Sequence, residues 1–305
     1  ESASSMAAVL VVLPVLCNAP EIKFDGVRNF RQVSTSLPGL YRSAKLEQAS
    51  LADVAELLDG QARIRTIIDL RNTDEIEKAG RSATAAGRAL LAAYQRADPV
   101  GSGCVASEGS GRLGWHHVPL LSNVDGFFDA VEAQLNPARR AEALCYKAID
   151  SRRYNQLLYD EVARGKQLLL NTAILKSAPA QSWRRALDLA ADRSRGGVLI
   201  HCAQGKDRTG LLAALLQHAA GDSEASIAEA YGASEALLQE PAMEKPSSEP
   251  SSGVDWSSLR GSPPEAMVGT LRWLKHEHGA IDCFLEGVGC GNQWREILVG
   301  STSSY

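Results

Sequence analysis

The sequence predicts an α/β fold with a mostly parallel central sheet flanked by helices, together with a helical insertion and C-terminal helices. Two apolar runs have the length and composition of buried strands, Arg63–Arg71 and Arg195–Cys202. The second run lies between two segments of helical periodicity, Ser182–Asp192 and Thr209–Gly221. This alternation of helix and strand favours βαβ units and therefore parallel strands.

The elements around the first strand are short. Lys23–Val33 and Pro38–Leu46 are expected as short strands or turns, and Glu47–Leu58 has the periodicity of a helix. After the strand, Asn72–Glu75 offers capping residues for a following helix. Ala83–Gly111 is rich in Ala, Gly and Ser, which predicts a helix followed by a flexible excursion.

The middle of the chain combines a further strand with a long helical stretch. Gly114–Leu121 has the length of a strand, and Pro119 indicates its end or an edge position. From Asp125 to about Leu189 the pattern is mainly helical, and it separates this strand from the next by an unusually long interval. We therefore expect residues 122–182 to form a helical insertion that acts as a lid.

The C-terminal part is predicted to be helical apart from one loop. Asp222–Leu238, Glu265–His276 and Ile281–Val299 have helical periodicity, whereas residues 241–264 form a flexible loop by composition. The parts fit one domain, residues 21–300.

Residues 1–20 are expected to be an N-terminal leader or extension. Their apolar run, residues 7–16, is too short to cross a bilayer and contains Pro14. The run could also belong to a targeting segment.

Composition limits the classes of function. With 45% hydrophobic residues, 22% charged residues and a net charge of -4, the chain has the composition of an ordinary globular protein, without the basicity typical of nucleic-acid binding. The six cysteines form no Cys-x-x-Cys pair and no zinc-type spacing, which favours a reducing compartment. We expect a cytoplasmic monomer with no cofactor, no nucleic-acid partner and no stable membrane insertion.

The residues with the clearest chemistry follow one another in a single loop: His201, Cys202, Ala203, Gln204, Gly205, Lys206, Asp207, Arg208 and Thr209. A glycine-containing turn that enters a helix presents unpaired backbone N–H groups and the positive end of the helix dipole, which together favour anions. At such a position, near two cationic side chains, Cys202 is expected to be a thiolate at neutral pH. Arg208 offers a planar fork for two phosphoryl oxygens.

The remaining residues of this loop are expected to bind and orient the substrate. The backbone amides of residues 203–208 would cradle one phosphate, and Gly205 relieves steric demand in the turn. The Thr209 hydroxyl could donate a hydrogen bond to the Cys202 sulfur and help it leave when water attacks. His201 would orient the loop from the end of the strand.

Cys-x5-Arg followed by Thr-Gly resembles the signature loop of the cysteine-dependent protein tyrosine phosphatases. The chain is similar to the atypical tyrosine/serine phosphatases of bacteria and plants. The stretches that carry this similarity are HCxxGKDRTG, GVRNFRQV, GLYRSAKL, TIIDLRNTDE and the C-terminal EAMVGTLRWLKHEHGAIDCFLEGVG. The resemblance covers roughly residues 24–298 in ordered pieces. It implies a protein tyrosine phosphatase-like fold and metal-independent hydrolysis of phosphotyrosine through a cysteinyl phosphate. Phosphoserine, phosphothreonine and phosphoinositides are the alternative substrates.

The resemblance also implies roles for two charged residues of the loop. Lys206 would add positive charge for doubly phosphorylated or inositol substrates. Asp207 would protonate the leaving oxygen as general acid. Asp125 is the alternative acid, because many related phosphatases use an aspartate that follows the strand equivalent to Gly114–Leu121.

Four further residues are expected to frame the pocket in supporting roles: Asn29, Arg31, Arg42 and Arg71. An ordinary ion pair with Asp69, on the same face of the strand, fits Arg71 equally well. His116 and His117 are disfavoured as metal ligands, because adjacent strand residues point to opposite faces. A phosphate-binding pseudophosphatase and a sulfurtransferase are the rival functions, and the intact loop argues against both.

Overall fold

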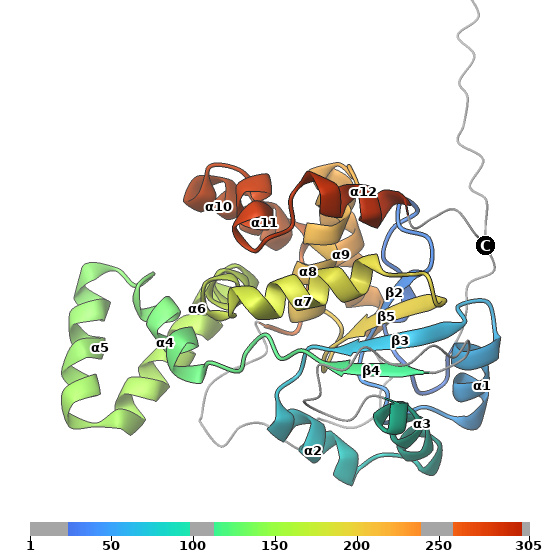
Figure 1. The fold of residues 1–305 in the computed structure, drawn as a ribbon. Coiled ribbons are helices and arrows are strands. Elements are labelled where there is room, and N and C mark those ends of the chain that lie inside the picture. The colour runs from blue at the N-terminus through green and yellow to red at the C-terminus, as the bar shows by residue number, and fades with distance from the viewer. Residues whose placement is uncertain (1–23, 98–112, 239–258, 301–305) are drawn as a thin grey trace, which may run out of the picture.

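The computed structural model describes residues 24–97, 113–238 and 259–300. Its strands are β1 (Arg31–Gln32), β2 (Leu40–Ser43), β3 (Ile64–Asp69), β4 (Gly114–His117) and β5 (Gly197–His201). They form one sheet in the order β1-β2-β5-β3-β4 (Figure 1). β1 runs antiparallel to β2, and the other neighbours are parallel. The predicted α/β fold with a mostly parallel sheet is confirmed.

Helices cover both faces of this sheet (Figure 1). In the described residues they are α1 (Leu51–Asp59), α2 (Thr73–Arg81), α3 (Ala85–Ala97), α4 (Val124–Glu132), α5 (Pro137–Ile149), α6 (Ser151–Ser177), α7 (Ala180–Ala191), α8 (Asp207–Ala219), α9 (Glu224–Leu238), α10 (Pro264–His278), α11 (Ile281–Gly287) and α12 (Asn292–Gly300). Strand residues alternate between the two faces. Ile68 and Ile200 belong to the core under α7 and α8, whereas Ile67 and Leu199 belong to the core under α1 and α3.

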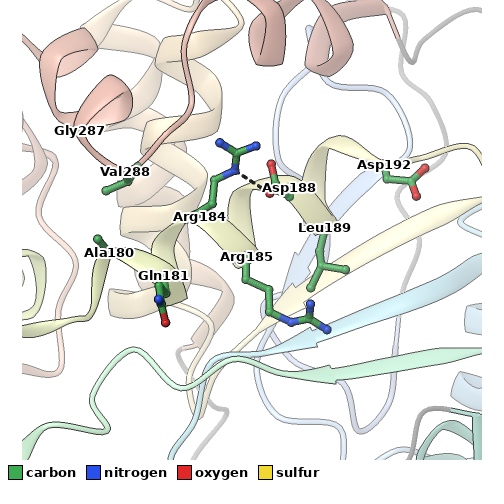
Figure 2. A pocket seen from close by; sticks show the side chains of 9 residues that line it. All are labelled: Ala180, Gln181, Arg184, Arg185, Asp188, Leu189, Asp192, Gly287 and Val288. Atoms are coloured by element: carbon green, nitrogen blue, oxygen red, sulfur yellow. Dashed lines mark hydrogen bonds and ion pairs between the residues drawn. The ribbon is translucent and has the colours of Figure 1, made fainter. Parts of the chain in front are cut away.

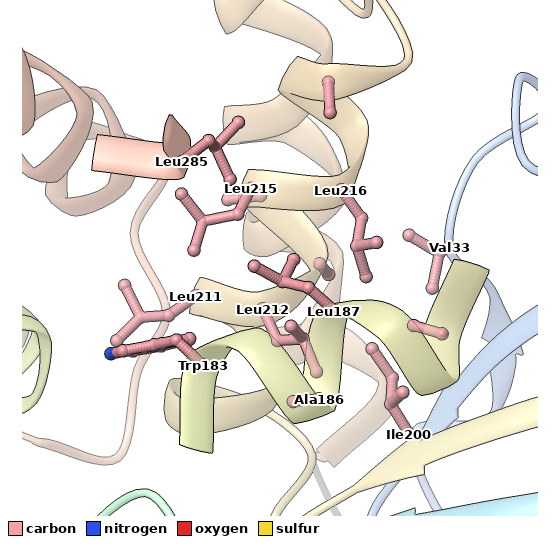
Figure 3. Packing of buried hydrophobic residues seen from close by; sticks show 14 of the residues in the cluster. Val33, Trp183, Ala186, Leu187, Ile200, Leu211, Leu212, Leu215, Leu216 and Leu285 are labelled. Carbon is pink, nitrogen blue, oxygen red and sulfur yellow. The ribbon is translucent and has the colours of Figure 1, made fainter. Parts of the chain in front are cut away.

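Helix α8 is buried on nearly all sides. Leu211, Leu212, Leu215 and Leu216 are each almost fully buried, and Figure 3 shows them packed against α7 and Leu285. An apolar surface around the whole helix explains why the sequence LLAALL has no polar stripe. The packing fixes the N-terminus of α8, and with it the end of the loop that carries Cys202.

The strand predicted at Gly114–Leu121 is shorter than expected, since β4 ends at His117. Val118 and Leu120 still donate backbone hydrogen bonds to Asp69 and Leu70, but Pro119 between them has no N–H to donate. The edge position that Pro119 indicated is confirmed.

The predicted helical insertion contains α4, α5 and α6, and it has a small core of its own. Phe128, Ala143 and Leu158, one from each helix, belong to this core. In Figure 1, α4 and α5 lie to one side of the sheet, at the end of α6. α6 contains a break at Lys166, which has a φ of 53° and a ψ of −153°, and the helical periodicity of the sequence did not indicate this break. Whether the insertion acts as a lid stays a prediction.

The C-terminal periodicity over Ile281–Val299 corresponds to two helices, α11 and α12, instead of one. They are separated by a turn in which Gly289 has a φ of 91°, a conformation that favours glycine. The leader at residues 1–20, most of the excursion after α3 and most of the loop 241–264 lie outside the described residues. Each helix in the described part of the chain is too short or too polar to cross a bilayer.

Candidate active site

The loop from Cys202 to Arg208 joins the central strand β5 to helix α8. β5 is buried at every position, and Cys202 directly after it is 3% exposed. Gly205 turns the chain with a φ of 65°, and a Cβ at this position would lie 2.0 Å from the carbonyl oxygen of Ser43. Only glycine fits so close to β2, which explains how this sequence folds into a tight turn.

The backbone of this loop keeps free hydrogen-bond donors. Among the residues that the structure describes, no acceptor takes the N–H groups of residues 203–206. Asn29 Nδ2 donates to the carbonyl oxygens of Gln204 and Gly205, each at 3.0 Å. Because C=O and N–H point in opposite directions in a trans peptide, the amides of Gly205 and Lys206 point away from Asn29. Adjacent free amides at a helix N-terminus are suited to an anion.

Asn29 is held in turn by Arg31. Arg31 donates to both oxygens of Asn29, and it also donates to the Ala230 carbonyl and the Ser234 hydroxyl of α9, each at 2.8 Å. Burial, and then the nearby charge of Arg42, lower the pKa of Arg31. Asn29 and Arg31 therefore support the loop from outside.

Arg208 is held by Glu75, a residue whose role sequence reasoning missed. Two guanidinium nitrogens donate to the two Glu75 carboxylate oxygens, at 2.5 and 2.8 Å. Burial alone would lower the pKa of Arg208, but the hydrogen bonds to Glu75 and the nearby negative charges together outweigh burial and raise it. One Glu75 oxygen also accepts the backbone N–H of Asn72 at 2.9 Å and caps α2. Two of the five N–H donors of Arg208 are thus used for orientation, and the others are left for a ligand.

The Lys206 side chain has two partners within the fold, and its substrate-binding role stays a prediction. The side chain is 1% exposed, and Nζ donates to Asp207 Oδ1 at 2.7 Å and to the Leu259 carbonyl at 2.9 Å. The ammonium is therefore committed to the neighbouring carboxylate and to the chain before α10. Asp207 is 21% exposed and keeps one carboxylate oxygen outside this ion pair.

Comparison with families of known proteins identifies the class to which this loop belongs. The sequence pattern of the tyrosine phosphatase family matches residues 22–300. The chain belongs to the tyrosine phosphatase family. No curated protein matches the chain. The match confirms the resemblance predicted from the loop, and it supports phosphatase activity and phosphorylated substrates in general.

In this member of the tyrosine phosphatase family, Arg71 lies in a buried ion network. It bonds Asp69 through two nitrogens, at 2.9 and 2.7 Å, and Glu47 at 2.7 Å. His201 lies next to them, with Nε2 3.6 Å from Asp69 and Nδ1 3.4 Å from the Cys202 carbonyl. Burial lowers the pKa of His201, which keeps the ring neutral at pH 7. Arg71 thus forms the ion pair with Asp69 that the sequence offered as the alternative to a role in the pocket. His201 is the last residue of β5, as expected.

Thr209 and Asp125 were also predicted to take part in the reaction. The Thr209 hydroxyl is buried and has no hydrogen-bond partner among the described residues, so the expected bond to the Cys202 sulfur is not formed. Asp125 is exposed in the first turn of α4, beside its N-cap Asn123. Its surroundings are those of an ordinary first-turn carboxylate.

A separate hollow lies between α7 and α11 (Figure 2). Arg184 lies along it, with Nε bonded to Asp188 at 2.6 Å, and no residue of the Cys202–Arg208 loop lines it. In the described part of the chain, no three His, Cys, Asp or Glu side chains are grouped as ligands for a metal ion.

Proposed function

We propose that the protein hydrolyses phosphotyrosine in proteins through a cysteinyl-phosphate intermediate, with Cys202 as nucleophile. The observation that carries the proposal is the row of free backbone N–H groups at residues 203–206, which lies between Cys202 and the oriented guanidinium of Arg208. Such donors match the three non-bridging oxygens of a phosphoryl group and stabilise the charge of its transition state. The reaction needs no metal, because the sulfur supplies the nucleophile.

In the first step, the Cys202 thiolate attacks phosphorus and an S–P bond forms as the P–O bond to the leaving group breaks. Arg208 and the loop amides hold the phosphoryl oxygens in line for this attack. Asp207 donates to the leaving oxygen the proton carried by its second carboxylate oxygen, the one that Lys206 does not contact. In the second step, Asp207 takes a proton from water, which attacks phosphorus, and the S–P bond breaks to restore the thiolate.

The environment of Lys206 favours substrates with a single phosphate. A second phosphate, as in doubly phosphorylated inositol lipids, would need a cation beside the loop, but Lys206 already donates to Asp207 and to the Leu259 carbonyl. Among substrates with one phosphate, phosphotyrosine is the leading candidate, because the chain belongs to the tyrosine phosphatase family. Phosphoserine, phosphothreonine and singly phosphorylated lipids are the alternatives.

A colorimetric assay tests the function directly. We expect hydrolysis of p-nitrophenyl phosphate. Vanadate should inhibit it, because five-coordinate vanadate mimics the trigonal-bipyramidal transition state of phosphoryl transfer, whereas EDTA should leave the rate unchanged, because the proposed mechanism uses no metal. Rates of hydrolysis on a panel of phosphotyrosine, phosphothreonine and phosphoinositide substrates then show which substrate class the enzyme prefers. Activity that requires a divalent metal would contradict the cysteine mechanism, and tight binding of phosphotyrosine peptide without turnover would indicate a pseudophosphatase.

Two aspartate variants distinguish the candidate acids. Asp207→Asn is expected to lower kcat on phenyl phosphate by about 10²-fold or more, within the range of general acid catalysis. The loss on p-nitrophenyl phosphate should be smaller, since that leaving group needs less protonation. Asp125→Asn is the matched control and should retain wild-type activity. The reverse pattern would transfer the acid role to Asp125.

A further inference from the structure

Arg42 is a buried cation just behind the Cys202–Arg208 loop. It belongs to β2, where it pairs with Ile200 of β5, and it is 1% exposed. One guanidinium nitrogen donates to the Gly205 carbonyl at 2.8 Å and lies 3.5 Å from the Lys206 carbonyl, whereas Nε has no partner. Among the described residues, no carboxylate forms an ion pair with Arg42.

The first turn of α8 leaves room for this guanidinium. A Cβ on Gly210 would lie 3.4 Å from an Arg42 nitrogen and 2.9 Å from the ring of Tyr231. Any side chain at this position would therefore displace the Tyr231 ring and would lie in van der Waals contact with the guanidinium. The glycine after Thr209 thus permits the close approach of Tyr231, which packs beside Arg42 at the start of α8.

A buried charge without a counter-charge is costly, so the missing partner of Arg42 is informative. The titratable groups that face it are Arg31 of β1, Cys202 after β5, Asp207 of α8 and Tyr231 of α9. Burial raises the pKa of Tyr231, which is neutral at pH 7, and Asp207 is paired with Lys206. Burial lowers the pKa of Arg42 to about 10, which leaves it a cation at neutral pH. Cys202 is the remaining group that can carry a negative charge.

We propose that Arg42 is a positioning residue for the phosphatase reaction, with the Cys202 thiolate and the bound phosphoryl group as its counter-charge. By holding the Gly205 and Lys206 carbonyls, it also turns the N–H groups of Lys206 and Asp207 toward the phosphoryl oxygens, because the two groups of each peptide point in opposite directions. The interaction of Arg42 with a bound phosphoryl group rests on the proposed function. Its effect on the ionisation of Cys202 can be measured without turnover.

Alkylation of Cys202 tests the charge of Arg42. Iodoacetamide reacts with the thiolate, so the rate at Cys202, followed by peptide mass spectrometry against pH, reports its ionisation. Arg42→Met is expected to slow alkylation of Cys202 at pH 6 by about tenfold, as loss of one nearby cation would. The exposed Cys145 and Cys283 are internal references whose rates should not change. A folded Arg42→Met protein with the wild-type profile would overturn the proposal.

Arg42→Lys tests the hold on the carbonyls, since it retains the charge but not the planar fork. We expect Cys202 alkylation within about twofold of wild type, because the charge is retained, and tungstate binding about fivefold weaker, because the hold on the amides is lost. If Arg42→Met does not fold, this variant decides, and tungstate affinity equal to wild type overturns the proposal. Wild-type protein that is inactive on every phosphate ester, yet shows the Arg42-dependent alkylation, would refute only the proposed function.

Discussion

Cys202→Ser is expected to lower kcat on p-nitrophenyl phosphate by about 10⁴-fold or more, as removal of the nucleophile does in covalent catalysis. A serine hydroxyl at this position is not ionised at neutral pH and is a much weaker nucleophile than a thiolate. Tungstate should still bind, because Arg208 and the amides of residues 203–206 are unchanged. Steady-state kinetics and calorimetric titration with tungstate measure the two effects separately.

Cys290→Ser is the matched control for this change. Cys290 is also buried, but it follows α11, and burial raises the pKa of its thiol to about 11, which makes it unreactive. This variant should retain kcat, whatever it loses in stability. Comparable activity in the two variants would exclude Cys202 as nucleophile.

Arg208→Lys has the second-largest expected effect, a loss in kcat of about 10²–10³-fold, the range for losing one donor that stabilises transition-state charge. A lysine carries the same charge but only one nitrogen, so it cannot bond both Glu75 oxygens and also hold two phosphoryl oxygens. Arg185→Lys, on the exposed side of α7, makes the same change away from the loop and should be neutral. Equal kcat in Arg208→Lys and wild type would show that the fork is not required.

The ion pair between Glu75 and Arg208 makes the stability of the fold depend on pH. Burial would raise the pKa of Glu75, but the hydrogen bonds and positive charge of Arg208, with smaller contributions from Asn72 and Arg71, together outweigh burial and hold it below the ordinary value of 4.5. The stabilisation is therefore present above about pH 4.5 and is lost as the pH falls through the depressed folded-state pKa. Glu75→Gln should flatten the fall of Tm between pH 5 and pH 3, which differential scanning fluorimetry measures; an unchanged slope would contradict the pairing.

Local patterns explain which parts of the fold could be predicted. The run from β5 through the Cys202–Arg208 loop into α8 was predictable because apolar strand, glycine turn and apolar helix follow one another directly. The placement of β5 between β2 and β3 was not predictable, because strand order depends on packing between distant segments. The break at Lys166 was missed, since helical periodicity continues on both sides of it.

In the candidate site, too, local patterns could be predicted and contacts between distant segments could not. Glu75 was predictable only as a capping residue, because its second partner, Arg208, is 133 residues away. The role of Lys206 toward substrate stays a prediction, and the sequence did not indicate that its ammonium donates to the Leu259 carbonyl, 53 residues away. Residue types in the loop thus indicate the chemistry, but contacts from other elements decide where each side chain points.

Rapid acid quenching of wild-type enzyme during turnover, followed by mass spectrometry of the peptide that carries residue 202, tests the covalent mechanism most directly. We expect one phosphoryl group on the Cys202 sulfur, formed within the first turnover and absent from the Cys202→Ser protein. Hydrolysis that proceeds with residue 202 unmodified, or phosphate found on another side chain, would contradict the account.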